Sequence, residues 1–360
     1  MTDLVTGFPG FIGRRLIAAL LDADADARVV ALVEPRMLAT AQTVAESLDA
    51  SRIELLAGDI TDRRLGLEPD DYERLRAEVR RVFHLAAIYD LAVPLELAQR
   101  VNVDGTGNVL DLCRAAERLE RLAYVSTAYV AGLRTGIVYE HELVMGQAFK
   151  NHYESTKFQA EVWVRDLLDQ VPTTILRPAI VVGDSHTGET EKFDGPYYIL
   201  RALSRAQRMG RPMPQFGRSE AAFNVVPVDY VVAAMTAAAD DPATLGQTLH
   251  LVDPDPLTAH DLVDLLSLAY TGGPPRGRVP AGLVERSLRV RRVRELFEGI
   301  PSESIAYLNH PVVYDARRTV DLLAPHGLVP PKFGEYAQAM VDFFRAHEDD
   351  PALRPKPPGG

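Results

Sequence analysis

The feature of this sequence that most constrains its fold is a regular alternation, over residues 3–180, of short apolar runs with longer amphipathic stretches. The runs are rich in β-branched residues, which favour strands, whereas the stretches repeat apolar residues every three or four positions, as helices do. Strands that alternate with helices form a parallel sheet with helices on both faces. The pattern therefore predicts a doubly wound α/β domain. The expected strands are residues 3–7, 28–33, 53–57, 79–85, 121–126 and 173–176, and the expected helices are residues 11–21, 37–48, 95–118 and 152–168.

The alternation loosens after residue 180, where a glycine- and charge-rich stretch begins. Long irregular segments in a compact chain mostly serve as lids or binding loops. We therefore expect residues 1–180 to form the α/β domain and residues 181–348 to form a smaller, mostly helical substrate-binding portion. Residues 225–252 are expected to return to the first domain, and residues 349–360 to form a disordered tail.

Three glycines at intervals of three lie between the first expected strand and the first expected helix. The segment is Thr6-Gly7-Phe8-Pro9-Gly10-Phe11-Ile12-Gly13. The first glycine permits a tight turn, the second lets the backbone approach a pyrophosphate, and the third lets the helix pack against the strand. The helix N-terminus then faces the phosphates. We predict a dinucleotide site here, which makes residues 1–180 an NAD(P)-binding domain of Rossmann type.

Acidic residues after the second and third expected strands indicate where the adenosine end of the cofactor binds. Glu34 follows Gly13 by twenty-one residues, where a carboxylate can hold the ribose hydroxyls and repel a 2′-phosphate. It could instead be a solvated strand end, and Arg36 two residues further on leaves NADP open. Asp59, followed by Ile60, can accept a hydrogen bond from the adenine amino group or cap the next turn.

Two pairs of polar residues suggest the catalytic site. Tyr153 and Lys157 are four residues apart and therefore share one face of the expected helix over residues 152–168. Ser126 and Thr127 end the fifth expected strand, at the edge where ligands bind in an open α/β sheet. An adjacent ammonium and a positively charged nicotinamide lower the pKa of a phenol, which suits Tyr153 to acid–base catalysis. Lys157 is also expected to bind the nicotinamide ribose, and Thr127, in preference to Ser126, to hold the substrate oxygen.

These segments occur in the order found in the extended branch of the short-chain dehydrogenase/reductase superfamily, which the chain resembles over about its first 185 residues. The matching segments are Thr6 to Gly13, His84-Leu85-Ala86-Ala87, Val125-Ser126-Thr127, Tyr153 to Lys157 and Arg177-Pro178. The segment Val101 to Leu110 resembles the helix in which this branch carries an asparagine that supports the active site, here Asn102. The resemblance implies further cofactor contacts at Leu85, Ala86, Ala87, Asn102, Tyr153, Lys157, Pro178 and Ile180.

The segments Leu55 to Asp59 and Phe223 to Val231 look most similar to the subgroup of thioester reductase domains and fatty acyl-CoA reductases. That resemblance implies reduction of a hydrophobic acyl thioester, or a related carbonyl compound, with NADPH. Glu34 departs from the subgroup, because a basic residue is expected beside the 2′-phosphate of NADPH. The choice between NAD and NADP therefore stays open.

Three other functions remain possible for the same residues. One is oxidoreduction of a ketone or secondary alcohol, as in the hydroxysteroid dehydrogenases and dihydroflavonol reductases. Another is nucleotide-sugar epimerisation, although no nucleotide-binding pattern is evident after residue 180. A third is a non-enzymatic redox sensor that binds NAD(P), against which the intact set of Thr127, Tyr153 and Lys157 argues.

Composition and charge exclude several classes of protein. The formal net charge of −11 repels nucleic acid phosphates, so we expect no nucleic acid partner. The single cysteine, Cys113, excludes an intramolecular disulfide and a thiolate metal cluster, and no His-Glu-x-x-His pair occurs, so we expect no metal. No apolar run reaches eighteen residues, and the expected first strand begins too early for a signal peptide. We therefore expect a cytoplasmic protein without a transmembrane segment.

Two further expectations concern partners. The expected helices over residues 95–118 and 152–168 resemble the pair that dimerises many relatives, which predicts a homodimer. A basic cluster lies on a helical pattern over residues 280–297 and favours a solvated face, with an acidic carrier protein, a CoA phosphate or a membrane surface as alternatives. Its members are Arg286, Arg289, Arg291, Arg292 and Arg294.

Overall fold

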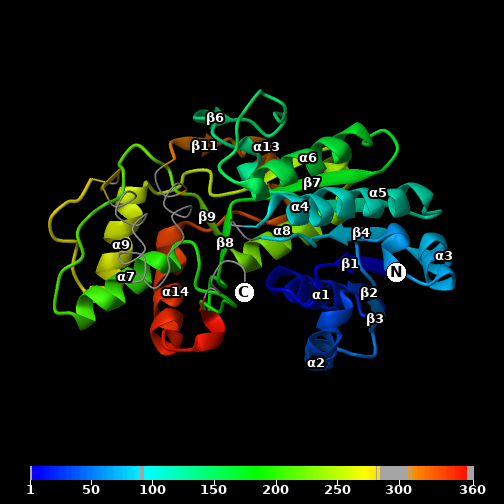
Figure 1. Ribbon diagram of the computed structural model, residues 1–360, viewed down its shortest axis with the longest axis horizontal. Coiled ribbons are helices and arrows are strands. Elements are labelled where there is room, and N and C mark those ends of the chain that lie inside the picture. Colours follow the sequence, from blue (N-terminus) through cyan, green and yellow to red (C-terminus); the bar gives the residue numbers. More distant parts are fainter. Residues whose placement is uncertain (1, 90–92, 281, 284–306, 308–309, 355–360) are drawn as a thin grey trace.

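The computed structural model of the chain describes residues 2–89, 93–280, 282–283, 307 and 310–354 (Figure 1). Its strands are β1 (Thr2–Thr6), β2 (Arg28–Val33), β3 (Ile53–Ala57), β4 (Arg81–His84), β5 (Arg121–Val125), β6 (Gly136–Val138), β7 (Thr173–Pro178), β8 (Ile180–Val182), β9 (Val225–Pro227), β10 (Thr248–Leu251) and β11 (Val312–Tyr314). Its α-helices are α1 (Phe11–Ala23), α2 (Leu38–Leu48), α3 (Pro69–Glu78), α4 (Leu95–Ala98), α5 (Gly105–Ala115), α6 (His152–Asp166), α7 (Tyr197–Arg208), α8 (Val228–Asp240), α9 (Ala259–Thr271), α13 (Arg317–Leu323) and α14 (Phe333–His347).

Seven strands form one sheet in the order β10-β7-β5-β4-β1-β2-β3, and every neighbouring pair is parallel. The prediction of a doubly wound, Rossmann-type sheet is therefore confirmed. The direction of winding reverses between β1 and β4, and ligands of such sheets bind beyond the carboxyl ends of the strands at this point. Residues 248–251 form the edge strand β10, beside β7.

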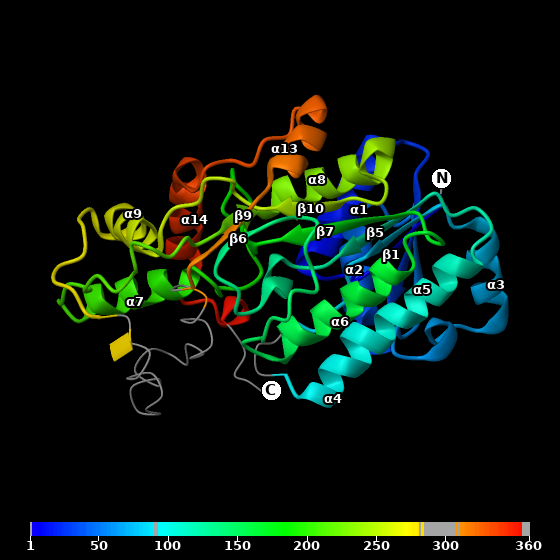
Figure 2. The same ribbon diagram turned by 90° about the horizontal axis from the view of Figure 1, so that it is seen from above.

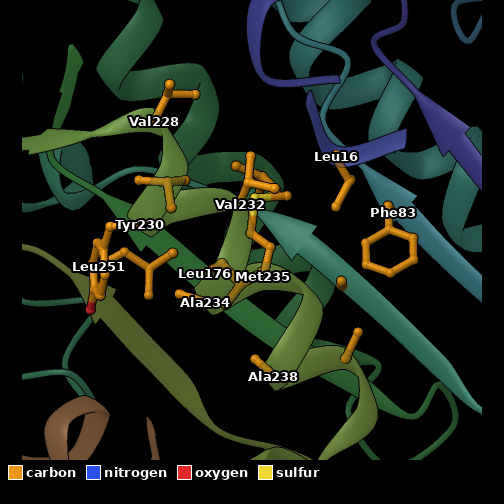
Figure 3. Packing of buried hydrophobic residues seen from close by; sticks show 14 of the residues in the cluster. Leu16, Phe83, Leu176, Val228, Tyr230, Val232, Ala234, Met235, Ala238 and Leu251 are labelled. Carbon is orange, nitrogen blue, oxygen red and sulfur yellow. The ribbon is translucent and has the colours of Figure 1, made fainter. Parts of the chain in front are cut away.

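Helices cover both faces of the sheet, as Figures 1 and 2 show: α1, α2 and α8 lie on one face, and α3, α5 and α6 lie on the other. Adjacent residues of each strand point to opposite faces. In β4, Phe83 packs in one apolar cluster with Leu16 of α1 and Met235 of α8 (Figure 3), whereas Val82 packs in another with Leu110 of α5. Burial on both faces explains why the strands are almost continuously apolar in the sequence.

The C-terminal portion has an apolar cluster of its own, built by α7, α9 and α14. Leu200 of α7, Leu262 of α9 and Phe344 of α14 are fully or almost fully buried in it. The short parallel pair of β8 and β9 leads from the main sheet toward these helices. None of the described helices is long and apolar enough to cross a membrane.

Two of the sequence-based expectations need correction. The helix expected over residues 95–118 contains a π-helical segment, Gln99–Asp104, between α4 and α5. The expectation of a disordered tail is wrong for residues 349–354, because the Phe193 N–H donates to the Leu353 carbonyl at 2.8 Å and Leu353 packs against the C-terminal cluster. The remaining tail, the basic cluster and most of the helix expected over residues 280–297 lie outside the described residues.

Candidate functional site

The glycine turn between β1 and α1 leaves little room for a side chain at its glycine positions. A Cβ atom on Gly13 would lie 2.6 Å from the Gly7 carbonyl oxygen, and one on Gly7, whose φ is +93°, would lie 3.0 Å from the Ala86 nitrogen. Gly10 is the N-cap of α1 and has no side chain with which to cap the helix. The first-turn N–H groups therefore stay available to an anion, and the turn fits a dinucleotide pyrophosphate.

A chain of hydrogen bonds runs from the end of β1, beside the glycine turn, to α5 and the π-helical segment before it. The Thr6 hydroxyl accepts from the Ala86 N–H at 3.1 Å and therefore donates to Nδ1 of His84, 2.8 Å away. Nε2 of His84 then donates to the Thr106 hydroxyl at 3.1 Å, which donates to the Asn102 carbonyl. Burial lowers the pKa of His84 to about 3, so the imidazole stays neutral in this chain.

Asn102 connects the segment after β4 to the helix that carries Tyr153. Its side-chain oxygen accepts from the Ile88 N–H at 2.9 Å, and its amide donates to the Thr156 hydroxyl at 3.1 Å. The π-helical segment turns this side chain inward, where it is 1% exposed. Asn102 therefore aligns two parts of the candidate site through its hydrogen bonds.

At the expected adenosine end, Glu34 and Arg36 form an ion pair with Nε and Oε1 2.5 Å apart, and both side chains are largely exposed. Asp59 accepts a hydrogen bond from the Thr61 N–H at 2.8 Å, as a turn cap does. Its neighbour Ile60 is buried against the helical layer that contains α5. One carboxylate oxygen of Asp59 thus stabilises the turn after β3, and the other can accept a hydrogen bond from a further partner.

The candidate catalytic residues meet where β5 ends and α6 begins. The Asn151 side chain caps α6, accepting from the Glu154 N–H at 3.0 Å, so Tyr153 lies in the first turn. Burial raises the pKa of Tyr153 to about 12, opposed by a hydrogen bond with Thr127. The Thr127 hydroxyl also lies 3.5 Å from the carbonyl of Pro178, the last residue of β7.

Lys157 lies one turn after Tyr153 and is 2% exposed. Its ammonium donates to the Val125 carbonyl at 2.8 Å and lies 4.6 Å from the centroid of the Tyr124 ring. Burial lowers the pKa of Lys157 to about 7, and Glu161 opposes this. The pKa of Tyr153 is therefore raised and not lowered as expected, because burial of the phenol has the largest effect and only the hydrogen bond with Thr127 opposes it.

The two hydroxyls at the end of β5 have different surroundings. Ser126 donates to Oε2 of Glu161 at 2.6 Å, below the site, whereas Thr127 contacts Tyr153. Glu161 also accepts from Nη2 of Arg177 at 2.6 Å, and all three side chains are almost completely buried. Sequence reasoning missed Glu161, although it continues the four-residue spacing that connects Tyr153 to Lys157.

Tyr89, also missed, covers the phenol from the substrate side. The Tyr89 and Tyr153 rings meet edge to face with centroids 5.2 Å apart, and the Lys192 ammonium lies 6.0 Å from the Tyr89 centroid. Lys192 in turn pairs with Asp194 at 3.4 Å. These residues come from the irregular segment after β8 and from the segment after β4, and nothing in their local sequence signals the contact.

The irregular segment after β8 is also attached to the helix of the glycine turn. Glu189 pairs with Arg14 at 2.9 Å and with Arg15 at 3.1 Å, and Glu191 pairs with Arg14 at 3.1 Å. Both arginines lie in α1 directly after Gly13. The segment therefore spans from the phosphate side of the candidate site to the residues above Tyr153.

His250, on β10, stabilises the strand end that carries Pro178. Its Nε2 accepts from Nη1 of Arg177 at 3.1 Å, and its Nδ1–H donates to the Asp315 carbonyl at 2.7 Å. Burial, together with the charge of Arg177, lowers the pKa of His250 to about 3. The imidazole is therefore neutral in the folded protein at neutral pH.

Acidification is expected to destabilise the protein through this histidine. In the unfolded chain His250 titrates near 6.5, whereas in the folded chain it does so near 3, so only the unfolded state gains a proton as the pH falls below 6.5. Between about pH 7 and about pH 5 we expect a loss of about 2 kcal/mol from this group. His250→Gln, whose amide can keep both hydrogen bonds, should flatten the pH dependence measured by urea denaturation. An equal pH dependence in the variant would contradict this assignment.

Comparisons with known proteins agree with this geometry. The model of a family described as male sterility protein matches residues 5–235. The chain is 31% identical over 288 residues to the aldehyde reductase lnaA of Aspergillus flavus, covering 73% of this chain and 27% of that protein. It is 29% identical over 289 residues to the non-canonical nonribosomal peptide synthetase FrzA of a Cladobotryum species, covering 75% of this chain and 28% of that protein. The chain thus spans about a quarter of the length of these relatives.

Among solved structures, the terminal R domain from the myxalamid PKS-NRPS biosynthetic pathway is similar over nearly the whole chain. The TM-score is 0.82 and the sequence identity 28%, and the match covers 98% of this chain and 92% of that one. The similarity therefore extends beyond the α/β domain to the C-terminal helices.

Proposed function

The chain belongs to the male sterility protein family and is an NAD(P)-dependent enzyme of the extended short-chain dehydrogenase/reductase type, and on this premise we propose that it reduces an acyl thioester to an aldehyde. The observation that supports this most is the grouping of Tyr153, Thr127 and Lys157 at the carboxyl edge of β5. The glycine turn of β1 opens at the same edge of the sheet. The similarity to an R domain of a PKS-NRPS pathway favours a thioester over a free ketone.

In the proposed reaction Thr127 and Tyr153 act on the substrate carbonyl. The nicotinamide supplies the hydride when bound. The Thr127 hydroxyl orients the carbonyl oxygen, and the Tyr153 phenol donates its proton to that oxygen as the carbon accepts the hydride. The carbon–sulfur bond of the resulting thiohemiacetal then breaks, which releases a thiol and leaves the aldehyde. Lys157 would hold the nicotinamide ribose, and Leu85, Ala86, Ala87, Pro178 and Ile180 would contact the cofactor.

The proposal is tested by the substrate that oxidises the cofactor. Purified protein is mixed with NADH or NADPH, and absorbance of the reduced nicotinamide is followed after addition of a long-chain acyl-CoA or of a panel of ketones. We expect thioester-dependent oxidation with release of free thiol and aldehyde. Activity with ketones alone would replace the proposal with a ketone or secondary-alcohol oxidoreductase, and cofactor binding without turnover would favour the redox-sensor alternative.

Glu34 is expected to make NADH the better reductant. Its carboxylate can accept from the adenosine ribose hydroxyls but repels a 2′-phosphate, although Arg36 partly neutralises it. Glu34→Gln removes the negative charge and frees Arg36, so the affinity for NADPH relative to NADH should rise about tenfold, as for the loss of one like-charge contact near a surface.

Fluorescence titration with both cofactors measures this preference. Glu54→Gln is a suitable control, because Glu54 is also exposed and paired with an arginine, Arg74, but lies near the start of β3 and not beyond the carboxyl end of a strand. An unchanged ratio of affinities in Glu34→Gln would remove Glu34 from the adenosine site.

The homodimer and the cytoplasmic location stay predictions. Two exposed apolar side chains, Leu95 of α4 and Trp163 of α6, lie in the helical layer expected to dimerise, which favours the homodimer. Light scattering of the purified protein at micromolar concentration should give twice the chain mass, and a monomeric mass would contradict the prediction.

A further inference from the structure

A fully buried carboxylate, Glu161, lies directly beneath the candidate catalytic residues. It follows Lys157 by one helical turn on the same face of α6, and its exposed fraction is 0%. Buried carboxylates are retained only where strong hydrogen bonds and opposite charges compensate for the lost hydration. The contacts of Glu161 therefore indicate what its charge is used for.

Glu161 binds two neighbouring strand ends at once. Oε2 accepts from the Ser126 hydroxyl at 2.6 Å, and the residue after Ser126 is Thr127. The guanidinium of Arg177 donates to both carboxylate oxygens, at 2.6 Å from Nη2 to Oε1 and at 3.0 Å from Nε to Oε2, and the residue after Arg177 is Pro178. One carboxylate thus fixes both strand ends of the candidate site to α6.

Among the described residues, Glu161 is also the one acidic group that acts on the charge of Lys157. The other groups near the ammonium are the Tyr124 ring of β5 and the neutral imidazole of His84 on β4. Burial alone disfavours the charged form of Lys157, and the negative charge of Glu161 opposes this. Although burial raises the pKa of Glu161, the charges of Arg177 and of Arg165, whose Nε lies 3.0 Å from Oε1, keep it below its usual range, so the carboxylate is ionised.

We propose that Glu161 is a positioning residue of this enzyme, which holds Thr127 in line with Tyr153 through Ser126 and keeps Lys157 protonated through its charge. The inference rests on the proposed function for its catalytic consequence. It assigns two separable roles to one carboxylate, a geometric role through Ser126 and an electrostatic role toward Lys157. Each role predicts a different variant phenotype.

Glu161→Gln removes the negative charge of the side chain and keeps its size and shape. The alkaline limb of the pH profile of kcat for reduction should move to lower pH by about one unit, because Lys157 then loses its proton more easily. The kcat near pH 7 should fall about fivefold and recover partly on acidification, while KM for the substrate changes little. Glu161→Asp and Ser126→Ala keep a carboxylate at position 161 but weaken its hold on the segment of Ser126 and Thr127. The kcat should therefore fall several-fold without a shift of its pH profile.

Glu140→Gln is the matched control. Glu140 is another buried carboxylate, whose side chain accepts from the N–H groups of Arg318 and Thr319 at 3.0 and 2.9 Å. Arg165 of α6 and Arg177 each donate to its backbone carbonyl at 3.4 Å, and a substitution of the side chain leaves that carbonyl in place. Loss of this carboxylate should lower the free energy of unfolding but leave the pH profile of kcat unchanged. The same shift in Glu140→Gln and Glu161→Gln would overturn the proposal, since the effect would then be a general loss of structure.

A second measurement is independent of turnover. The chain contains five lysines, so NMR of ¹³Cε-labelled lysine can follow the titration of Lys157 in the whole protein. A lower titration midpoint in Glu161→Gln supports the electrostatic role, and an unchanged midpoint overturns it. If Glu161→Gln does not fold, a normal kcat in both Glu161→Asp and Ser126→Ala overturns the geometric role. A shifted midpoint in a protein that reduces no substrate would refute the proposed function and leave the control of Lys157 by Glu161 standing.

Discussion

Tyr153→Phe should reduce kcat by a factor of roughly 10² to 10⁴, the usual contribution of a positioned acid or base. The phenylalanine keeps the buried ring and its edge-to-face contact with Tyr89 but has no proton to donate. The glycine turn is unaffected, so cofactor affinity should stay within a few-fold of the original. The kcat is measured by stopped-flow or steady-state oxidation of the reduced cofactor, and the cofactor affinity is measured by fluorescence titration.

Tyr270→Phe controls for the loss of a phenol elsewhere in the chain. The Tyr270 hydroxyl donates to Glu348 at 3.1 Å between α9 and the end of α14, far along the chain from β5. We expect this variant to retain normal kcat. If Tyr153→Phe also turned over normally, another residue would have to be the proton donor, and the assignment of Tyr153 would be abandoned.

Gly13→Ala should have the second large effect, on both stability and cofactor binding. The added Cβ would lie 2.6 Å from the Gly7 carbonyl oxygen, so helix α1 must move away from β1. Overpacking of this kind costs about 1–3 kcal/mol. The same displacement moves the N-terminus of α1, so the affinity for NADH or NADPH should fall at least tenfold.

Gly273→Ala is the corresponding control, because no atom of the described residues lies within 4 Å of the position of its Cβ and its φ is not positive. Within experimental error, thermal denaturation should give this variant the same midpoint as the parent protein, and cofactor titration should give it the same affinity. Unchanged cofactor affinity in Gly13→Ala would mean that the glycine turn serves only the packing of α1 on β1.

Several elements could be predicted from the sequence because their signals are local. The strands β2 and β3 have the predicted bounds. β2 is an apolar run that is buried almost throughout, and β3 is a short, mostly apolar segment at the edge of the sheet. The glycine turn was equally evident, because three glycines between a strand and a helix have few other uses. The four-residue spacing of Tyr153 and Lys157 likewise follows from the helix in which they lie.

Other elements could not be predicted, because their stabilising partners are distant in sequence. The three-residue strands β6 and β11 pair Gly136–Val138 with Val312–Tyr314, and each is too short to show a period of its own. Helix α7 was missed although its apolar residues recur at three- and four-residue spacing, because it follows directly on the irregular segment; its apolar face packs against α9 and α14. The attachment of residues 349–354 to Phe193 is another contact of this kind.

The sequence by itself determined the doubly wound sheet, the position of the phosphate-binding turn and the identity of the polar residues at the end of β5, because each depends on the chemistry of a few consecutive residues. Only the tertiary structure decided how those residues are used. It directs Ser126 to Glu161 and Thr127 to Tyr153, and burial raises the pKa of Tyr153 to about 12 and lowers that of Lys157 to about 7. Burial and pairing of charges depend on side chains from three or more elements, and no segment of the sequence contains that information.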